Sequence, residues 1–183
     1  MSSGAHVDPS NKKIALQIAI LAVVLAFSET LGKGAQTAAL SYNIEASNLW
    51  SFFQAKTLRQ TTMRTAAEGL DAQFGDKATE AVKKQIDTWK KTAERYQSEP
   101  ETNEGRKELA SRAKKAEEKR DRSLASYHHY EVASAAVQIA IVLASAEVIT
   151  SVVALGWASA ALGVAAVVFC FIGYFWPMAV HLF

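Results

Sequence analysis

Two acidic residues stand in otherwise apolar runs, where an ionisable side chain could bind or carry ions. Glu147 lies near the end of the run 132–149, and Glu29 lies near the end of the run 14–31. A charged side chain at the centre of a bilayer costs about 3 kcal/mol or more, so such a residue is a candidate for an ion or proton pathway. Both acids also lie close to polar segments, from which they could reach the lipid headgroups. We favour this simpler interpretation for each of them.

Other polar residues in these runs suggest contacts between helices. Glu147 could itself form a hydrogen bond between helices or subunits. Gln17 and Gln138 each stand near the start of an apolar run, and amide side chains in such positions are expected to join spanning helices rather than to hold a ligand. Glu29 and Glu147 are expected near opposite faces of the membrane, which argues against one shared site.

His128, His129 and Glu131 could suggest a metal site. Adjacent histidines on a helix point about 100° apart, so they cannot chelate one ion as histidines four positions apart can. We expect them to lie in an interfacial aromatic band, with a ring of histidines around an oligomer axis as the alternative. The sequence contains no glycine-rich phosphate loop, zinc-ligand spacing or nucleophile elbow. We therefore predict no enzymatic activity, no catalytic residue, no metal and no cofactor.

The charged residues are strongly segregated along the 183-residue chain. Residues 32–127 contain 18 of the 20 lysines and arginines and 14 of the 18 acids, whereas residues 128–183 contain no lysine or arginine and two acids. A soluble domain distributes charge over its surface, so this tail indicates a bilayer. The single cysteine, Cys170, lies in an apolar run and excludes an intrachain disulfide.

The hydropathy pattern predicts an N-terminal lead and three transmembrane helices, at residues 1–11, 12–34, 128–150 and 155–177. Each apolar run has about 18 residues or more, which at ~1.5 Å per residue just crosses a ~30 Å hydrocarbon core. Lys12 and Lys13 ahead of the first run also fit a secretory signal peptide. Because the helical pattern continues through the would-be cleavage site, we expect an uncleaved anchor.

The charged middle of the chain, residues 35–127, is predicted to form an antiparallel coiled-coil hairpin outside the membrane. We expect a turn near residues 75–76, with Asp76 capping the second helix, and a kink near residues 98–105, where Pro100 and Gly105 interrupt the pattern. Side chains spaced alternately by four and three positions form a seam, which Lys56 and Gln60 interrupt. Its main apolar members are Leu49, Phe53, Met63, Leu70, Val82, Ile86 and Trp89.

Two aromatic residues near the start of this hairpin fall outside the seam. Trp50 and Phe52 would be exposed on a two-helix hairpin. Exposed large apolar side chains that cluster commonly mark an interaction surface. We therefore expect this pair to contact another subunit or a partner protein.

The stretch AQTAALSYNIEASNLWSFFQAKTLRQ, the charged hairpin and the later VQIAIVLASAEVIT form a recognisable order of elements. This order resembles a family of small bacterial three-span membrane proteins catalogued as a domain of unknown function. Its members show a tryptophan, an aromatic pair and a Gln-Ala-Lys triplet after the first span, and Gln-Ile-Ala-Ile opens the second. The matching residues here are Trp50, Phe52, Phe53, Gln54, Ala55, Lys56 and the four residues 138–141.

The resemblance implies an orientation but no reaction, substrate or catalytic residue. Family members often carry basic residues between the last two spans, which implies a cytoplasmic N-terminus and a periplasmic hairpin. This sequence has Thr-Ser-Val-Val-Ala at residues 150–154 instead. Positive charges flanking the hairpin, such as Lys33 and Lys119, taken alone favour a cytoplasmic hairpin.

We expect an all-α integral membrane protein that is a non-enzymatic homo-oligomer with a structural or scaffolding role in a bacterial inner membrane. Its expected partners are the lipid bilayer and further copies of itself. The net charge of +2 comes from mixed signs, which lacks the one-sign basic face that nucleic acid requires. One alternative is a small channel or transporter subunit using Glu147. Another is an accessory subunit that docks on a larger membrane complex through its hairpin.

Overall fold

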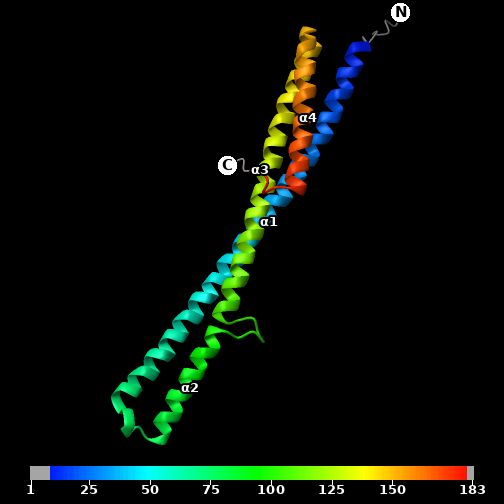
Figure 1. Cartoon of the computed structure of the whole chain (residues 1–183). Coiled ribbons are helices and arrows are strands. Elements are labelled where there is room, and N and C mark those ends of the chain that lie inside the picture. The colour runs from blue at the N-terminus through cyan, green and yellow to red at the C-terminus, as the bar shows by residue number, and fades with distance from the viewer. Residues whose placement is uncertain (1–8, 181–183) are drawn as a thin grey trace, which may run out of the picture. The chain divides into compact units, whose positions relative to one another are not determined.

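The computed structural model describes residues 9–180 of the chain, and every regular element in that range is helical. The prediction of an all-α fold is therefore confirmed. Four α-helices and one 3₁₀ turn follow in the order α1 (Pro9–Phe74), η1 (Gly75–Lys77), α2 (Glu80–Gln97), α3 (Arg106–Thr150) and α4 (Val153–Phe175) (Figure 1). Three of these helices, α1, α3 and α4, each contain an apolar stretch long enough to cross a membrane.

The first helix begins earlier than the sequence predicts. α1 starts at Pro9, a residue whose fixed φ angle and missing N–H suit the first turn of a helix. Residues 9–11 of the predicted lead are therefore helical. Residues 1–8 of that lead lie outside the described part of the chain.

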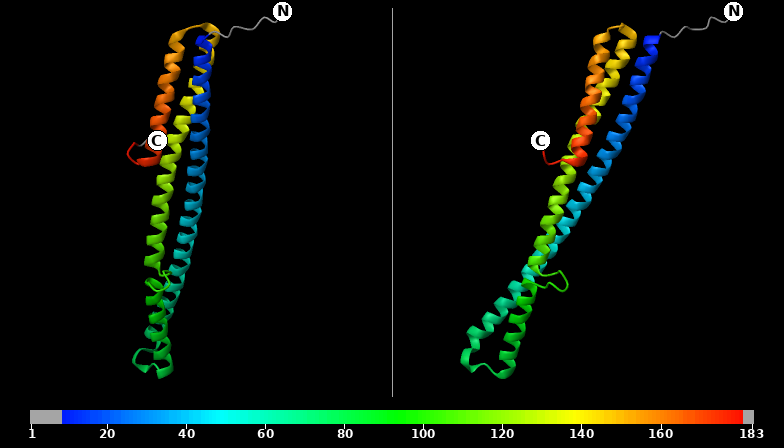
Figure 2. Two further views of the ribbon diagram at one scale, coloured as in Figure 1. Left: turned by 90° about the vertical axis from the view of Figure 1, so that its right-hand side faces the viewer. Right: turned by 45° about the vertical axis from the view of Figure 1, so that its right-hand side comes forward.

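The chain divides into two compact units, and α1 and α3 each contribute to both. Unit 1 comprises Met1–Leu40 and Asp121–Phe183. In it, α4 lies beside the first part of α1 and the last part of α3 (Figure 2). These three segments surround a small-residue core of Leu21, Ala133, Val137, Ala140 and Ala166.

Small residues on one face of α4 allow the helices of unit 1 to approach closely. Gly156, Ser159, Gly163, Ala166 and Gly173 are all buried, and successive members are three, four or seven positions apart, so they share one side of the helix. A Cβ atom added to Gly163 would lie 2.7 Å from Leu21 Cδ2, and one added to Gly173 would lie 2.8 Å from His129 Cβ. Glycine is therefore required by close packing at Gly173.

Unit 2 comprises Ser41–Arg120. Its α1 segment runs beside α2 over one half and beside α3 over the other (Figures 1 and 2). The α1 and α2 segments are antiparallel, because Gln60 bonds to Ala93 and Asp71 pairs with Lys90. The core on the α3 side contains Ala46, Leu49, Leu109, Ala113 and Ala116.

The turn of unit 2 differs in one detail from the prediction. Gly75 follows the last residue of α1 with a φ of 44°, which suits glycine at a helix C-terminus. Asp76, however, lies inside the 3₁₀ turn and does not cap α2. Thr79 is the cap, and its hydroxyl oxygen accepts a 3.4 Å hydrogen bond from the amide of Val82. The three-residue turn displaces the cap by three positions.

Candidate functional site

The break between α2 and α3 is the most polar buried region of unit 2. The chain leaves α2 after Gln97 and enters α3 at Arg106, so residues 98–105 form a loop. This loop lies against the α1 seam where Lys56 and Gln60 interrupt it. The two residues are only 6% and 3% exposed. We refer to Lys56, Gln60, Gln97, Glu99 and Arg106 as the polar joint.

Lys56 supplies the positive charge on the α2 side of the joint. Its ammonium group lies 3.3 Å from Glu99 and 4.0 Å from Glu104. It also lies 5.5 Å from the ring centre of Phe52 and 5.2 Å from that of Tyr96. A buried ammonium needs this combination of carboxylates and aromatic faces, because desolvation without them is costly.

Gln60 and Arg106 connect all three helices of unit 2. The Gln60 amide donates to the Ala93 carbonyl at 2.9 Å and to the Gln97 side chain at 3.1 Å. Arg106 donates to the side-chain oxygens of Gln60 and Gln97, and its Nε donates to Thr57 at 2.8 Å. One guanidinium thus binds acceptors on α1 and α2 from the first residue of α3. The fixed fork of arginine suits this role better than lysine would.

Aromatic residues near the joint also have partners within the chain. Trp50 donates from Nε1 to Glu117 at 2.9 Å and packs edge-on against Phe53 at 5.4 Å between ring centres. Phe52 packs on the same core cluster. The expectation that Trp50 and Phe52 are exposed is wrong: both are half-buried, because α3 returns along the face of α1 that a two-helix hairpin would leave open. Their contact with another subunit or a partner protein stays a prediction.

The predicted seam residues of unit 2 all face its interior to some degree. Leu49 and Ile86 are buried, and the others are half-buried, namely Phe53, Met63, Leu70, Val82 and Trp89. Ala67 and Ala93 are more fully buried than any of these. Because these two alanines are the most buried, the helices approach each other closely at the alanine positions, which lie between the larger side chains of the seam.

Glu108, in the first turn of α3, fixes the loop of the joint. Its carboxylate accepts from the Ser98 hydroxyl at 2.7 Å and from the Glu99 amide at 3.1 Å. The hydrogen bond from Ser98 is the main reason that the pKa of Glu108 lies below its ordinary value, and the backbone amides of Glu108 and Glu99 add to the effect. The loop is therefore held by a carboxylate in its ionised form.

Acidification is expected to loosen this loop. A carboxyl group whose pKa is lower in the folded than in the unfolded state stabilises the fold at pH values above its unfolded-state pKa, about 4.3. This stabilisation is lost as the pH falls through the folded-state pKa. Hydrogen exchange of the Glu99 amide, corrected for its intrinsic rate, should show protection that decreases below about pH 4. Glu108→Gln should remove this pH dependence, whereas Glu118→Gln, on an exposed position of the same helix, should leave it unchanged. Protection that is constant from pH 3 to 6 would contradict the assignment.

A second polar contact joins the three helices of unit 1. The Gln17 amide donates to Ser159 Oγ at 2.9 Å and to the Gly156 carbonyl at 3.3 Å. The fully buried Ser159 hydroxyl donates to the carbonyl of Ala140 at 2.7 Å. Gln17 on α1 is thus connected through α4 to α3, as expected for an amide between apolar helices.

Gln138 does not join two helices. Its amide bonds to Ser134 of its own helix at 3.4 Å, and it lines an open groove of about 450 Å³ between α1 and α3 of unit 1. Glu29 and Glu131 line the same groove together with Lys33. Glu29 is exposed there, so this groove is polar and open.

Glu147 lies near the other end of unit 1, on α3 and against Gly156 of α4. A Cβ atom on Gly156 would overlap the Glu147 carboxylate. The carboxylate lines a cleft of about 350 Å³ with Lys13, Gln17 and Trp157. Glu29 and Glu147 therefore line different clefts.

The paired histidines occupy different environments. His129 is buried, stacks on Phe169 and lies with its Nε2 3.2 Å from the carbonyl oxygen of Pro177. His128 is half-buried and faces Glu131 at 3.7 Å. In the described part of the chain, no group of three or more acidic, histidine or cysteine side chains could hold a metal ion.

Sequence reasoning missed several partners in these contacts. Arg106, Glu99 and Glu117 were indistinguishable from the many charged residues of a solvated helix. Ser159 and Gly156 belong to a small-residue segment of the last apolar run that indicates close helix packing, but the segment does not identify Gln17 or Ala140 as the partners. No local signal links either set to its partners, because the partners are distant in the sequence.

One comparison with known proteins gives a match. The sequence model of a family described as a domain of unknown function, DUF4337, matches residues 10–176. Neither the curated proteins nor the solved structures contain a significant match. The match covers both clefts of unit 1 and the whole polar joint.

Proposed function

Since the chain belongs to the DUF4337 family, whose function is unknown, we propose from its geometry that it is a non-enzymatic membrane protein that presents a stiff helical arm. The arm is unit 2, and unit 1 is the anchor. We place it in a bacterial inner membrane, with the N-terminus in the cytoplasm and the arm in the periplasm. Its role would be structural, as a scaffold built from several copies.

The distribution of exposed apolar side chains carries this proposal. Among the described residues, all but three of the large hydrophobic side chains that are exposed belong to unit 1. The three exceptions in unit 2 are Ile44, Leu58 and Phe74. An apolar surface of that extent in water would promote aggregation, whereas in a bilayer it would contact lipid. Unit 2 instead exposes mixed charge.

The polar joint supports a role for unit 2 as an arm rather than a flexible tether. A loop of eight residues between helices would ordinarily allow them to move. Here Lys56, Gln60 and Arg106 connect the loop and both flanking helices to α1 through hydrogen bonds that are buried or partly buried. Buried polar groups that are fully paired resist separation, because an unpaired group is costly.

A second stripe on α1 supports self-association. Nine exposed residues of unit 2 follow one another at alternating intervals of four and three on the side of α1 away from the seam, and none is charged. They are Ile44, Asn48, Ser51, Ala55, Leu58, Thr62, Thr65, Gly69 and Ala72. This spacing is that of a coiled-coil seam. Copies inserted in one membrane share an orientation, so their α1 helices could pair in parallel and in register.

Disulfide crosslinking through this stripe tests the proposal. Leu58, which is 70% exposed, should be replaced by cysteine in a Cys170→Ala background, so that it carries the only thiol. In a parallel, in-register pair the two Leu58→Cys positions face each other at a distance that a disulfide can bridge. Oxidation of native membranes should then convert most of the chain to dimer.

Arg64→Cys in the same background is the matched control. Arg64 is exposed on the same helix but lies outside the stripe. It should yield several-fold less dimer than Leu58→Cys. Equal crosslinking at both positions, or monomer alone at Leu58→Cys, would contradict self-association through this stripe.

A channel or transporter subunit is the second candidate, and the cleft beside Glu147 is the observation that favours it. An ionisable group facing a cleft in a spanning segment could bind an ion or a proton. Ion flux into liposomes that is lost in an assembled Glu147→Gln variant would favour this candidate. An accessory role in a larger complex would instead be supported by stoichiometric co-purification of a second protein that depends on unit 2.

A further inference from the structure

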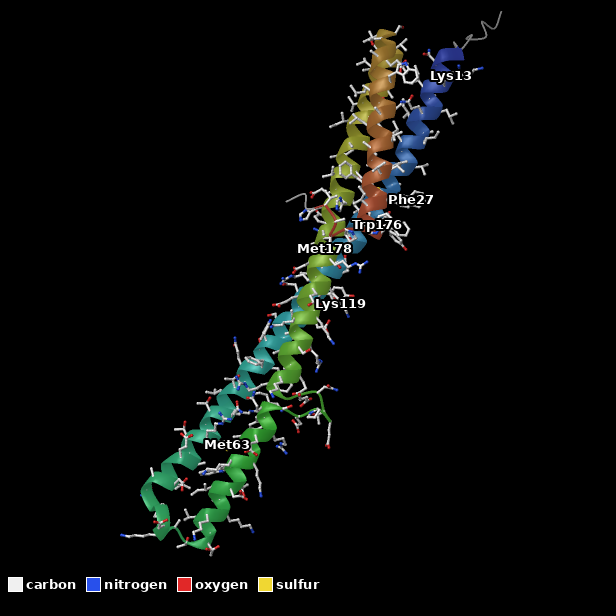
Figure 3. The ribbon with its side chains drawn as sticks, viewed as in Figure 1. Lys13, Phe27, Met63, Lys119, Trp176 and Met178 are labelled. Carbon is white, nitrogen blue, oxygen red and sulfur yellow. The ribbon has the colours of Figure 1, made fainter. Side chains whose placement is uncertain are left out.

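Two adjoining hollows in unit 1 differ in their chemistry. The more polar one is the cleft of about 350 Å³ that Lys13, Gln17, Glu147 and Trp157 line. The apolar one, which we call the furrow, has about 520 Å³ and runs between α1 and α4. Lys13, Gln17 and Ala160 line both, so the cleft continues into the furrow. Figure 3 shows Lys13 near the start of α1, at the end of unit 1 where α3 turns into α4.

The furrow has the lining that a hydrocarbon chain requires. Its walls are aliphatic side chains of α1 and α4, including Leu16, Ile20, Val164 and Val168. Gly163 also lines the furrow, and no side chain projects into it from that position. Only Lys13 and Gln17 at one end are polar. Trp157 is 75% exposed at that end, and tryptophan favours the level of the lipid headgroups.

The cleft contains one group of each charge. The Glu147 carboxylate fills the space over Gly156 and makes no hydrogen bond or ion pair with any residue in the described range 9–180. Lys13 contributes an ammonium group to the same cleft. A half-buried carboxylate that has no partner among the described residues favours a cationic ligand group, while the lysine favours an anionic one.

We propose that the cleft and furrow bind phosphatidylethanolamine, a zwitterionic phospholipid whose headgroup contains a primary ammonium and a phosphate and no further charged group. The ammonium group would donate to Glu147, the phosphate would pair with Lys13, and one acyl chain would lie in the furrow. An anionic lipid without an ammonium group would gain from Lys13 but be repelled by Glu147. This inference rests on the proposed insertion of unit 1 in a membrane.

Competition between two lipids tests the site. The full-length chain is purified in detergent, mixed with equal amounts of phosphatidylethanolamine and phosphatidylglycerol, and the lipids retained are counted by native mass spectrometry. The wild type should retain phosphatidylethanolamine preferentially. Glu147→Gln should reduce that preference about tenfold, since a hydrogen bond to a charged group is lost. Lys13→Gln should weaken the retention of both lipids, because they share the phosphate.

Two further variants keep the test specific. Glu29→Gln makes the same chemical change in the separate groove of unit 1 and should leave the preference intact. Gly156→Ala keeps the Glu147 charge but places a Cβ atom where the carboxylate lies. Because that carboxylate ends a flexible side chain, the helix should still fold, and the preference should fall as in Glu147→Gln.

The outcomes separate this inference from the proposed function. Release of the chain from membranes by an alkaline carbonate wash would overturn membrane insertion. A chain that stays in the membrane but retains both lipids equally would overturn only the lipid site. The site would also be overturned if Glu147→Gln retained phosphatidylethanolamine as the wild type does.

Discussion

Replacing Arg106 by alanine is expected to lower the free energy of unfolding by about 2–4 kcal/mol, because it removes the donor shared by one buried and two half-buried acceptors. The side-chain oxygens of Gln60 and Gln97 and the hydroxyl of Thr57 all receive hydrogen bonds from this guanidinium. Gln60 is too deeply buried to exchange its lost partner for water. Thermal unfolding of the full chain in detergent, followed by circular dichroism, measures the change.

Arg112→Ala is the matched control for this prediction. Arg112 lies on the same helix and donates one exposed hydrogen bond, to the carbonyl of Asn103 at 3.2 Å. Its loss should change the stability by no more than about 0.5 kcal/mol. Arg106→Lys should fall between the two, because it keeps the charge without the fork. If Arg106→Ala were no more destabilising than Arg112→Ala, the joint would contribute little to the stability of unit 2.

Replacing Gly173 by alanine is expected to cost about 1–3 kcal/mol, because the added methyl group overpacks the contact between α4 and α3. It would lie 2.8 Å from His129 Cβ, 3.1 Å from Tyr130 Cε1 and 3.4 Å from the carbonyl oxygen of Ser126. Cβ and backbone atoms cannot move aside without moving the helix. The end of α4 must therefore shift away from α3, and the contact between His129 and Pro177 should weaken.

Gly163→Ala makes the same substitution on the same face of α4 at a more tolerant position. Its methyl group meets one close atom, Leu21 Cδ2 at 2.7 Å, and that atom ends a side chain that can change rotamer. The melting temperature in detergent should therefore fall clearly for Gly173→Ala and little for Gly163→Ala. The reverse order would show that the close approach at Gly173 is not limiting.

The features that sequence predicted well are those set by periodicity and hydropathy. The apolar runs are helical except for Trp176 and Pro177 at the end of the last predicted span, and the alternating spacing from Ala46 to Leu70 identified the residues of α1 that face the interior of unit 2. The break after Gln97 followed from Pro100 and Gly105, which act locally. In each case the determining residues lie close to the feature that they produce.

The contacts that sequence did not predict depend on register between distant helices. Lys56 and Gln60 were recognised as interruptions of the seam, but their hydrogen-bond partners are separated from them by 33 to 46 residues. Whether Trp50 is exposed depends on whether α3 returns beside α1, and no local pattern decides that. The neighbour of Glu147 is Gly156, a residue that presents no side chain by which the contact could be anticipated.

The polar joint also constrains the order in which the chain can fold as it is synthesised. Lys56 and Gln60 leave the ribosome well before their partners, and residues 97–106 must follow before every hydrogen bond of the joint can form. In a nascent chain that ends within α2, Lys56 would lack Glu99, the carboxylate with which it pairs in the folded protein. Pairing of α1 with α2 alone should therefore be weak, and unit 2 should close only after the first turn of α3 has been made.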